Sequence, residues 1–119
     1  MKDGFIRVAA ATPKVRVADP IYNSEQIQAQ MDVAAAKQTK VLVFPELSLT
    51  AYTCGDLFFQ CTLLAEAKNQ LKQLVKKSAD SDMLTFVGLP WEYRGQVYDV
   101  LAAIQGGWLL GLIPKFYVS

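Results

Sequence analysis

The centre of the chain reads Lys40-Val41-Leu42-Val43-Phe44-Pro45-Glu46. Four consecutive apolar residues, two of them β-branched, lie here between a lysine and a proline. A short apolar run with such boundaries predicts a central parallel strand that is covered on both faces. The stretch therefore indicates an α/β fold in which Glu46 directly follows a buried strand.

The residues before this stretch predict a strand and then a helix. Residues 5–11 (FIRVAAA) form an apolar run typical of a buried strand, and residues 15–17 alternate as an edge segment would. Asn23 is a good helix N-cap, and Gln26 three residues later completes an amide version of the capping box. We expect this helix to run to about Lys37.

The residues after it predict a loop, a helix and a further strand. Residues 48–60 carry no clear period and are expected to form a loop with one helical turn. Residues 62–78 place leucines, alanine and valine on one face at helical spacing. Residues 84–89 (LTFVGL) form the next apolar run, which we expect to end at Pro90.

The last third of the chain predicts a β-hairpin. Apolar runs over residues 97–104 and 108–113 are separated by Gly106-Gly107, a pair that suits a two-residue turn with positive φ. The resulting order of strand, helix, strand, helix, strand and hairpin predicts a mixed α/β sheet with helices on at least one face.

Length and composition set the class of protein. The chain has 119 residues, of which 52% are hydrophobic, and its 12 Lys and Arg against 11 Asp and Glu give a net charge of +1. This size fits one small domain. The charge balance argues against a nucleic-acid partner, which would call for a basic stripe. No apolar run approaches the ~20 residues that span a bilayer, so no membrane partner is expected.

The chain contains no histidine. This absence excludes Ser-His-Asp and Cys-His nucleophile pairs and histidine-bearing zinc sites within these residues. Cys54 and Cys61 are the only cysteines and cannot complete a four-cysteine zinc site, so we expect no metal site. The N-terminus carries no secretory signal pattern, and the two thiols are expected to be free in the cytoplasm. Catalysis here would have to use a carboxylate, lysine, tyrosine or thiol.

Glu46 is the first catalytic candidate. A carboxylate that directly follows a buried strand lies at the carboxyl edge of the sheet, where α/β folds place their ligands. Partial burial beside Phe44 and Leu47 would raise its pKa and suit it to general-base catalysis. A helix cap or a salt bridge to a lysine is the structural alternative.

Lys115 is the second candidate, because it too follows an apolar strand directly. An ammonium group held there could stabilise an oxyanion, although a solvated lysine at a strand end is the commoner case. Cys54 could be a reactive thiol or simply a packed one. Lys68, Lys72 and Lys76 recur every four residues and indicate a solvated helix face more than a site for an anionic partner.

Three motifs together resemble the nitrilase superfamily of carbon–nitrogen hydrolases. They are Phe44-Pro45-Glu46-Leu47, the following residues 50–58 (TAYTCGDLF) and Gly111-Leu112-Ile113-Pro114-Lys115. More narrowly, the chain is similar over nearly its whole length to the N-terminal glutaminase domain of glutamine-dependent NAD(+) synthetases. The resemblance implies part of an αββα sandwich. Residues 1–119 would be an incomplete N-terminal portion of that hydrolase domain, with the synthetase domain absent.

The resemblance also implies roles for single residues. Glu46 matches the family's general base and Lys115 the lysine that steadies the tetrahedral intermediate. Tyr52 lies close to the glutamate and would line the glutamine pocket. The family's nucleophilic cysteine belongs to a later Cys-Glu motif that residues 1–119 do not contain, so Cys54 does not match it and these residues alone are expected to be inactive.

The function that the resemblance implies is hydrolysis of the glutamine amide. The ammonia would serve the ATP-dependent amidation of nicotinic acid adenine dinucleotide to NAD, with ATP and Mg bound by the absent synthetase domain and no cofactor in residues 1–119. A homo-oligomer is expected. Two alternatives stay open: a stand-alone amidase, carbamoylase or ω-amidase of the same superfamily, and a catalytically inactive module that only binds or assembles.

Overall fold

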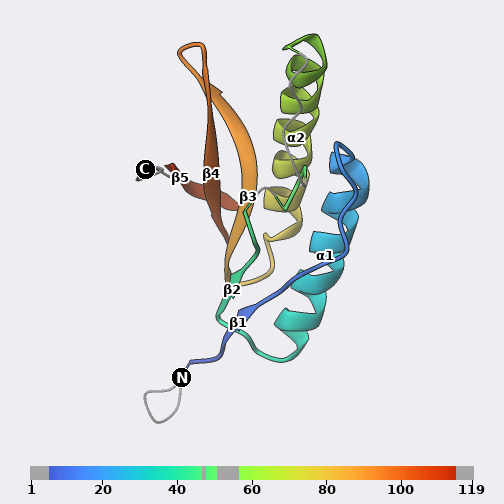
Figure 1. The fold of residues 1–119 in the computed structure, drawn as a ribbon. Coiled ribbons are helices and arrows are strands. Elements are labelled where there is room, and N and C mark those ends of the chain that lie inside the picture. The colour runs from blue at the N-terminus through green and yellow to red at the C-terminus, as the bar shows by residue number, and fades with distance from the viewer. Residues whose placement is uncertain (1–5, 47, 51–56, 115–119) are drawn as a thin grey trace, which may run out of the picture.

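A computed structural model describes residues 6–46, 48–50 and 57–114, and for residues 57–61 it describes the backbone alone. Within these residues, five strands and two helices follow one another in the predicted order (Figure 1). They are β1 (Val8–Ala10), α1 (Pro20–Ala36), β2 (Val41–Val43), α2 (Leu57–Lys77), β3 (Leu84–Tyr93), β4 (Gln96–Gln105) and β5 (Trp108–Pro114). The predicted mixed α/β architecture is confirmed.

The strands form one sheet in the order β1-β2-β3-β4-β5. β1, β2 and β3 are parallel, while β4 is antiparallel to both of its neighbours. β5 therefore runs in the same direction as β2. The carboxyl ends of β2 and β5 consequently meet the same edge of the sheet, although they lie three strands apart.

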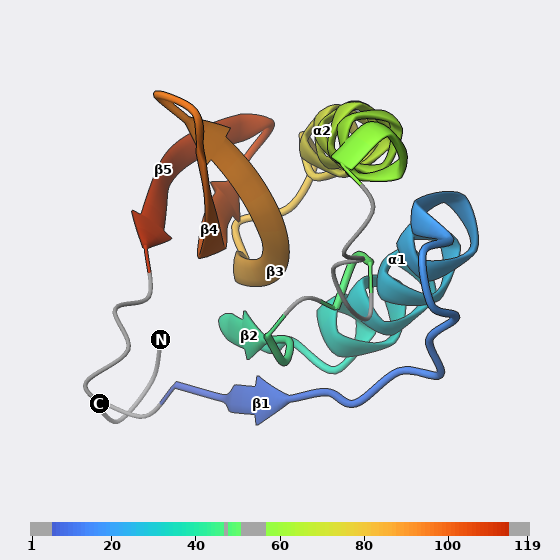
Figure 2. The same cartoon turned by 45° about the horizontal axis from the view of Figure 1, so that its top comes forward.

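Both helices lie on one face of the curved sheet (Figure 2). Consecutive right-handed crossovers that step in one direction across a sheet place their helices on the same side. On that face Leu42 of β2 is 1% exposed, whereas Val41 and Val43 point to the other face and are half-buried. The prediction that this strand is covered on both faces is therefore not met within the described residues, but its central, parallel position is confirmed.

The hydrophobic core lies between the sheet and the helices. Alternate residues of each strand supply one side of it, because successive strand side chains point to opposite faces. Burying one side chain of leucine size stabilises the fold by about 1.5–3 kcal/mol. The most deeply buried members include Ile27, Leu42, Leu71, Leu74, Val87, Leu89 and Ile104.

The opposite face of the sheet is also apolar. Val8 and Ile113 are 61% and 50% exposed there, and the residues between them are half-buried. We call this surface the open face; it comprises Val8, Val41, Val43, Leu84, Phe86, Leu101 and Ile113, which share one side by their strand pairing. An apolar sheet face of this kind is typical of one layer of a two-sheet sandwich.

The start of α1 differs from the prediction. Asp19, not Asn23, is the N-cap, and its Oδ1 accepts the Tyr22 N–H at 3.1 Å. Pro20 occupies the first helical position, where its missing N–H costs no helical bond and its fixed φ suits the helix. The helix therefore begins three residues before Asn23, and its predicted end near Lys37 is confirmed by a cap at that residue.

β3 also differs, because it continues through Pro90 to Tyr93 instead of ending at the proline. Gly88 directs its N–H to Ser48 Oγ and its C=O to the Leu49 N–H, away from β4. Strand alternation gives Pro90, two residues on, the same orientation. Its missing N–H thus falls on the side where β2 has already ended, so the pairing with β4 is intact.

Other boundaries differ as well. β1 is only Val8–Ala10, residues 15–17 form no strand, and α2 begins at Leu57 within the predicted loop. The Gly106-Gly107 hairpin turn is confirmed, with φ of 59° and 85°. A second hairpin, which the sequence analysis missed, turns at Arg94-Gly95, where both φ values are again positive.

Candidate functional site

Glu46 lies in the turn that follows β2, as predicted. The chain leaves β2 but still follows β3, because the Phe44 N–H donates to the Phe86 carbonyl at 2.9 Å. Phe44 is buried, whereas Glu46 is exposed. The expected desolvation of the Glu46 carboxylate is therefore not found in this structure. Leu47, the other predicted neighbour, lies outside the described residues.

Ser48 ties this turn to β3. Its side chain is buried, with the residue 3% exposed, and its Oγ accepts the Gly88 N–H at 3.2 Å and lies 3.5 Å from the Gly88 carbonyl oxygen. The Leu49 N–H donates to the same carbonyl at 3.0 Å. A serine side chain thus takes the place of a strand partner for Gly88 beyond the end of β2.

Asn23 ties the other side of the turn to α1. This residue is 0% exposed, and its Nδ2 donates to the Leu49 carbonyl at 3.0 Å and to the Arg16 carbonyl at 2.8 Å. Its Oδ1 accepts the Arg16 N–H at 2.6 Å. The Ala18 N–H adds a bond to the Thr50 carbonyl at 2.8 Å. The turn is therefore held from two sides by buried hydrogen bonds.

The sequence patterns do not predict these two anchoring residues. Asn23 fits a helix cap by its residue type, but it precedes the buried Ile27 by four residues. It therefore lies on the apolar stripe of α1 that continues through Met31. An amide on a core-facing stripe indicates a buried hydrogen-bonding role, and this signal could have identified Asn23. No comparable signal in the sequence singles out Ser48.

Lys115 and Tyr52 lie outside the described residues, as does Cys54. The strand pairing nevertheless locates the residue before Lys115. One row of paired residues crosses the sheet from β2 to β5 and consists of Val43, Phe86, Ala103 and Gly111. Glu46 follows Val43 by three residues, and Pro114 follows Gly111 by three residues. The topology thus brings Glu46 and the end of β5 to one edge of the sheet.

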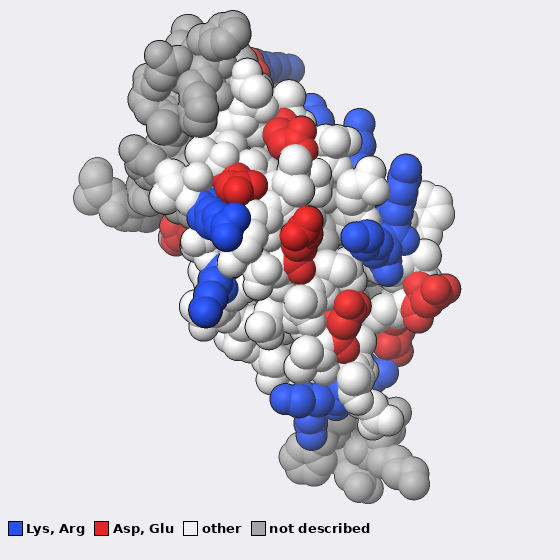
Figure 3. Space-filling model, turned by 90° about the vertical axis from the view of Figure 1, so that its right-hand side faces the viewer, with Lys and Arg blue, Asp and Glu red and all other residues white. Residues whose placement is uncertain are grey.

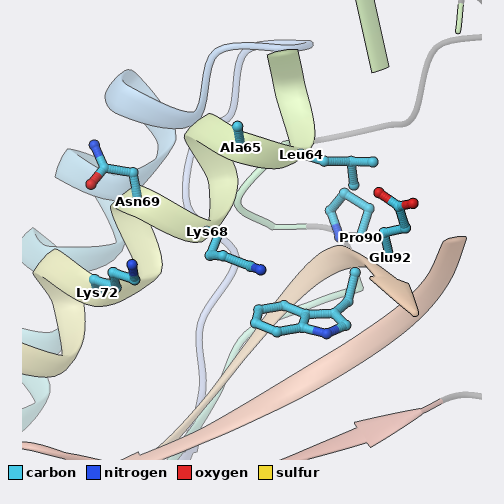
Figure 4. A pocket seen from close by; sticks show the side chains of 8 residues that line it. Leu64, Ala65, Lys68, Asn69, Lys72, Pro90 and Glu92 are labelled. Atoms are coloured by element: carbon cyan, nitrogen blue, oxygen red, sulfur yellow. The ribbon is translucent and has the colours of Figure 1, made fainter. Parts of the chain in front are cut away.

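A pocket of about 310 Å³ lies elsewhere, between α2 and β3 (Figure 4). Lys68 Nζ lies 4.5 Å from the ring centroid of Trp91, within cation–π range. Lys68, Lys72 and Lys76 are exposed, and Figure 3 shows acidic and basic side chains interspersed on the helical side of the molecule. This arrangement agrees with the predicted solvated helix face.

The clearest electrostatic perturbation lies near the opposite edge of the sheet. Lys40 lies just before β2 and Asp82 just before β3, and Lys40 Nζ lies 2.9 Å from Asp82 Oδ2. The hydrogen bond from Lys40 and its charge hold the pKa of Asp82 below its ordinary value. Because Asp82 is exposed, this pair joins two strand starts and contributes little to the candidate site.

Two absences concern the described part of the chain. Within it, no group of three or more Cys, Asp and Glu side chains could hold a metal ion. None of its helices combines the length and the apolar character that crossing a membrane requires.

Comparison with known proteins adds homology to this geometry. No family model matches the chain. It is 36% identical over 118 residues to the glutamine-dependent NAD(+) synthetase of Mycobacterium bovis, and 33% identical over 114 residues to that of Aquifex aeolicus. These matches cover 97% and 96% of this chain, but 17% and 20% of the relatives.

The chain is homologous to the N-terminal, nitrilase-like part of glutamine-dependent NAD(+) synthetases. Among solved structures, the NAD(+) synthetase of Cytophaga hutchinsonii superposes with a TM-score of 0.85 at 24% identity, covering 96% of this chain and 19% of that one. A variant of a Nesterenkonia amidase from the nitrilase superfamily gives 0.76 at 20% identity, covering 96% and 44%. These likenesses confirm the predicted nitrilase-type fold.

Proposed function

We propose that this chain is the N-terminal portion of a glutaminase domain that hydrolyses the glutamine side-chain amide. The released ammonia would serve the ATP-dependent amidation of nicotinic acid adenine dinucleotide to NAD. One observation carries the proposal: homology to NAD(+) synthetases extends over 97% of the chain and includes the turn in which Glu46 follows β2. Residues 1–119 would then form an incomplete hydrolase domain.

In the proposed reaction Glu46 is the general base. Its carboxylate takes the proton of a cysteine thiol that lies outside residues 1–119, and the thiolate attacks the amide carbon of glutamine. In two variants of the Nesterenkonia amidase, acrylamide and the acetamide moiety of fluoroacetamide are added at the active-site cysteine, which supports this class of nucleophile. The protonated Glu46 then donates to the leaving nitrogen and releases ammonia. Water hydrolyses the remaining thioester to glutamate.

Lys115 is proposed to hold the oxyanion of the tetrahedral intermediate. An ammonium fixed at the carboxyl edge would stabilise the charge that develops on the amide oxygen. The topology supports this role, because Pro114 precedes Lys115 at the same edge as Glu46. Tyr52, six residues after Glu46, is proposed to line the glutamine pocket.

The remaining parts of the proposal concern the whole protein. ATP and Mg would be bound by a synthetase domain that residues 1–119 do not include, and nicotinic acid adenine dinucleotide would be its second substrate. We expect no cofactor in residues 1–119, a homo-oligomeric assembly and a cytoplasmic location. These five points remain predictions.

A catalytically inactive assembly module is the second candidate. The observation that favours it is the open face, on which Val8 is 61% exposed and Ile113 is 50% exposed. Apolar patches of this kind mark interaction surfaces. A stand-alone amidase remains the third candidate, since the Nesterenkonia enzyme shares the fold.

The test compares residues 1–119 with the protein expressed from its complete natural reading frame. Both are supplied with glutamine labelled with ¹⁵N in the side-chain amide, and the release of labelled ammonia is measured. We expect release from the complete protein and none above background from residues 1–119. Release from residues 1–119 alone would overturn the assignment of the nucleophile. A complete protein that hydrolyses other amides and not glutamine would support the amidase, and one that hydrolyses none would support the assembly module.

A further inference from the structure

The segment that carries Glu46 is short and has little regular structure of its own. We define the glutamate turn as residues 44–50, without Leu47, which the structure does not describe. β2 contributes only three residues before it, and the Phe44 N–H extends the contact with β3 by one bond. The position of Glu46 therefore depends on how the rest of the turn is anchored.

One anchor is β3. Ser48 Oγ and the Leu49 N–H both bond to Gly88, so they fix one point of the turn. The Phe44 N–H bond to Phe86 holds the start of the turn, and the Ala18 N–H bond to Thr50 holds its end. A second buried anchor, on α1, then restricts the orientation of Glu46 relative to the sheet edge.

Asn23 is that second anchor. Its bond to the Leu49 carbonyl joins positions 26 residues apart in sequence, and this carbonyl belongs to the residue whose N–H reaches Gly88. Leu49 is thus held to α1 through its carbonyl and to β3 through its N–H. Glu46 lies three residues away on the same turn.

The chemistry of this position requires an amide. The Asn23 side chain donates to two carbonyl oxygens and accepts one N–H, while the residue is completely buried. Asparagine provides both donors and acceptors in one planar group. Aspartate has the same shape but would direct a carboxylate oxygen at the two carbonyls. Alanine would leave the buried Leu49 carbonyl and the partly buried N–H and carbonyl groups of Arg16 without this partner, and a buried polar group without a partner is destabilising.

We propose that Asn23 is a positioning residue that orients the glutamate turn, so that Glu46 can reach the reacting thiol. The proposal rests on the proposed function, in which Glu46 is the general base. Asn23 itself touches no reacting atom. A misplacement of about 1 Å at a catalytic group can lower the rate about 10²-fold, so loss of this anchor should affect turnover more than substrate binding.

The first measurement needs no activity. Amide hydrogen exchange is followed in residues 1–119 for the wild type, Asn23→Asp and a core control, Leu74→Ala, whose side chain packs in the core from α2. In Asn23→Asp we expect the Leu49 and Ala18 amides to exchange at least about 10-fold faster relative to the amides of β4. Leu74→Ala should raise exchange throughout without that preference.

The second measurement uses the protein from its complete reading frame. Asn23→Asp should lower kcat for glutamine about 10- to 100-fold with KM changed less than about 3-fold, while Leu74→Ala, assayed where it is folded, should change kcat less than about 3-fold. Equal losses in the two variants, or uniform exchange in the first measurement, would overturn the positioning role. The measurements distinguish a failure of the general-base proposal for Glu46 from a failure of the anchoring proposal for Asn23. If Glu46→Gln leaves kcat unchanged, the general base is wrong, whereas the exchange of the Leu49 amide still decides whether Asn23 anchors the turn.

Discussion

The two halves of the sheet are built in different ways. β1 and β2 are three residues long, run parallel and are joined through α1. β3 and β4 are ten residues each, are joined by a two-residue turn and pair from Thr85 to Tyr93. The hairpin half gains its stability from a continuous ladder of local pairs. The parallel half depends on the core beneath it and on side-chain bonds from Asn23 and Ser48. Glu46 lies in the parallel half, directly after β2.

This difference explains what each half can do. Long antiparallel pairs supply a rigid platform, while a short strand followed by an anchored turn can present a side chain at the sheet edge. Precise placement of Glu46 then has to come from buried hydrogen bonds in place of a strand ladder.

The largest effect should come from Leu42, which is the core-facing residue of β2 and 1% exposed. Leu42→Ala should lower the free energy of unfolding by about 2–5 kcal/mol, because it removes buried apolar surface and leaves a cavity. Leu101→Ala, on the half-buried open face of β4, is the matched control and should cost clearly less. Urea unfolding of both variants measures the difference. Equal costs would show that the parallel half does not depend on its core.

Ser48→Ala should come next. The change leaves the Gly88 N–H, a buried backbone donor, without its partner and should cost about 1–3 kcal/mol in urea unfolding. Ser81→Ala provides a partly buried serine at the start of β3 as a comparison, where Ser81 Oγ accepts the Met83 N–H at 3.1 Å. A loss at Ser48 no larger than at Ser81 would contradict the anchoring role.

A substitution at Thr85 should raise the free energy of unfolding, in contrast to the two substitutions above. Its hydroxyl is buried on the core side of β3 and has no hydrogen-bond partner among the described residues. Thr85→Val keeps the β-branched shape and removes the unsatisfied group, so it should raise the free energy of unfolding by about 1 kcal/mol. Thr39→Val, a buried threonine that is not in a strand, serves for comparison. A destabilised Thr85→Val protein would mean that the hydroxyl is satisfied in solution.

The smallest effect should be the acid dependence of the Lys40–Asp82 pair. A carboxyl group whose pKa is lower in the folded protein adds stability above its unfolded pKa, and that stability is lost as the pH falls through the folded pKa. Wild type should therefore lose a small increment of stability below about pH 4 that Asp82→Asn does not lose. Thermal unfolding between pH 6 and pH 2.5 measures it. Identical acid profiles for the two proteins would exclude a stabilising role for the pair.

The sequence predicts the repeating elements better than it predicts their ends. The apolar run at 41–44 and the Gly106-Gly107 pair are local signals, and the structure confirms the central parallel strand and the hairpin turn that they indicate. The role of Asn23 differs from the predicted cap because its partners, Arg16 and Leu49, become neighbours only when α1 packs beside the turn. Pro90 does not end β3 because a proline ends a strand only if its missing N–H faces a partner, and the sequence does not show where β2 stops.

The same reasoning applies to the candidate site. The position of Glu46 directly after an apolar run predicts that it lies at the edge of the sheet, and the structure has Glu46 there. The carboxylate's predicted desolvation depends on residues that cover that edge, and Glu46 is exposed in the described structure. A local sequence pattern indicates which strand a residue follows, but it cannot indicate what covers the residue.

The central claim is that Glu46 is the general base of glutamine hydrolysis. It is tested most directly by kcat for labelled glutamine in the protein from its complete reading frame, with Glu46→Gln beside Glu25→Gln, an exposed glutamate on α1. Removing a general base costs about 10²–10⁴-fold, so Glu46→Gln should lose at least about 100-fold while Glu25→Gln stays within about 2-fold of wild type. A Glu46→Gln protein that hydrolyses glutamine as fast as the Glu25→Gln protein would contradict the account.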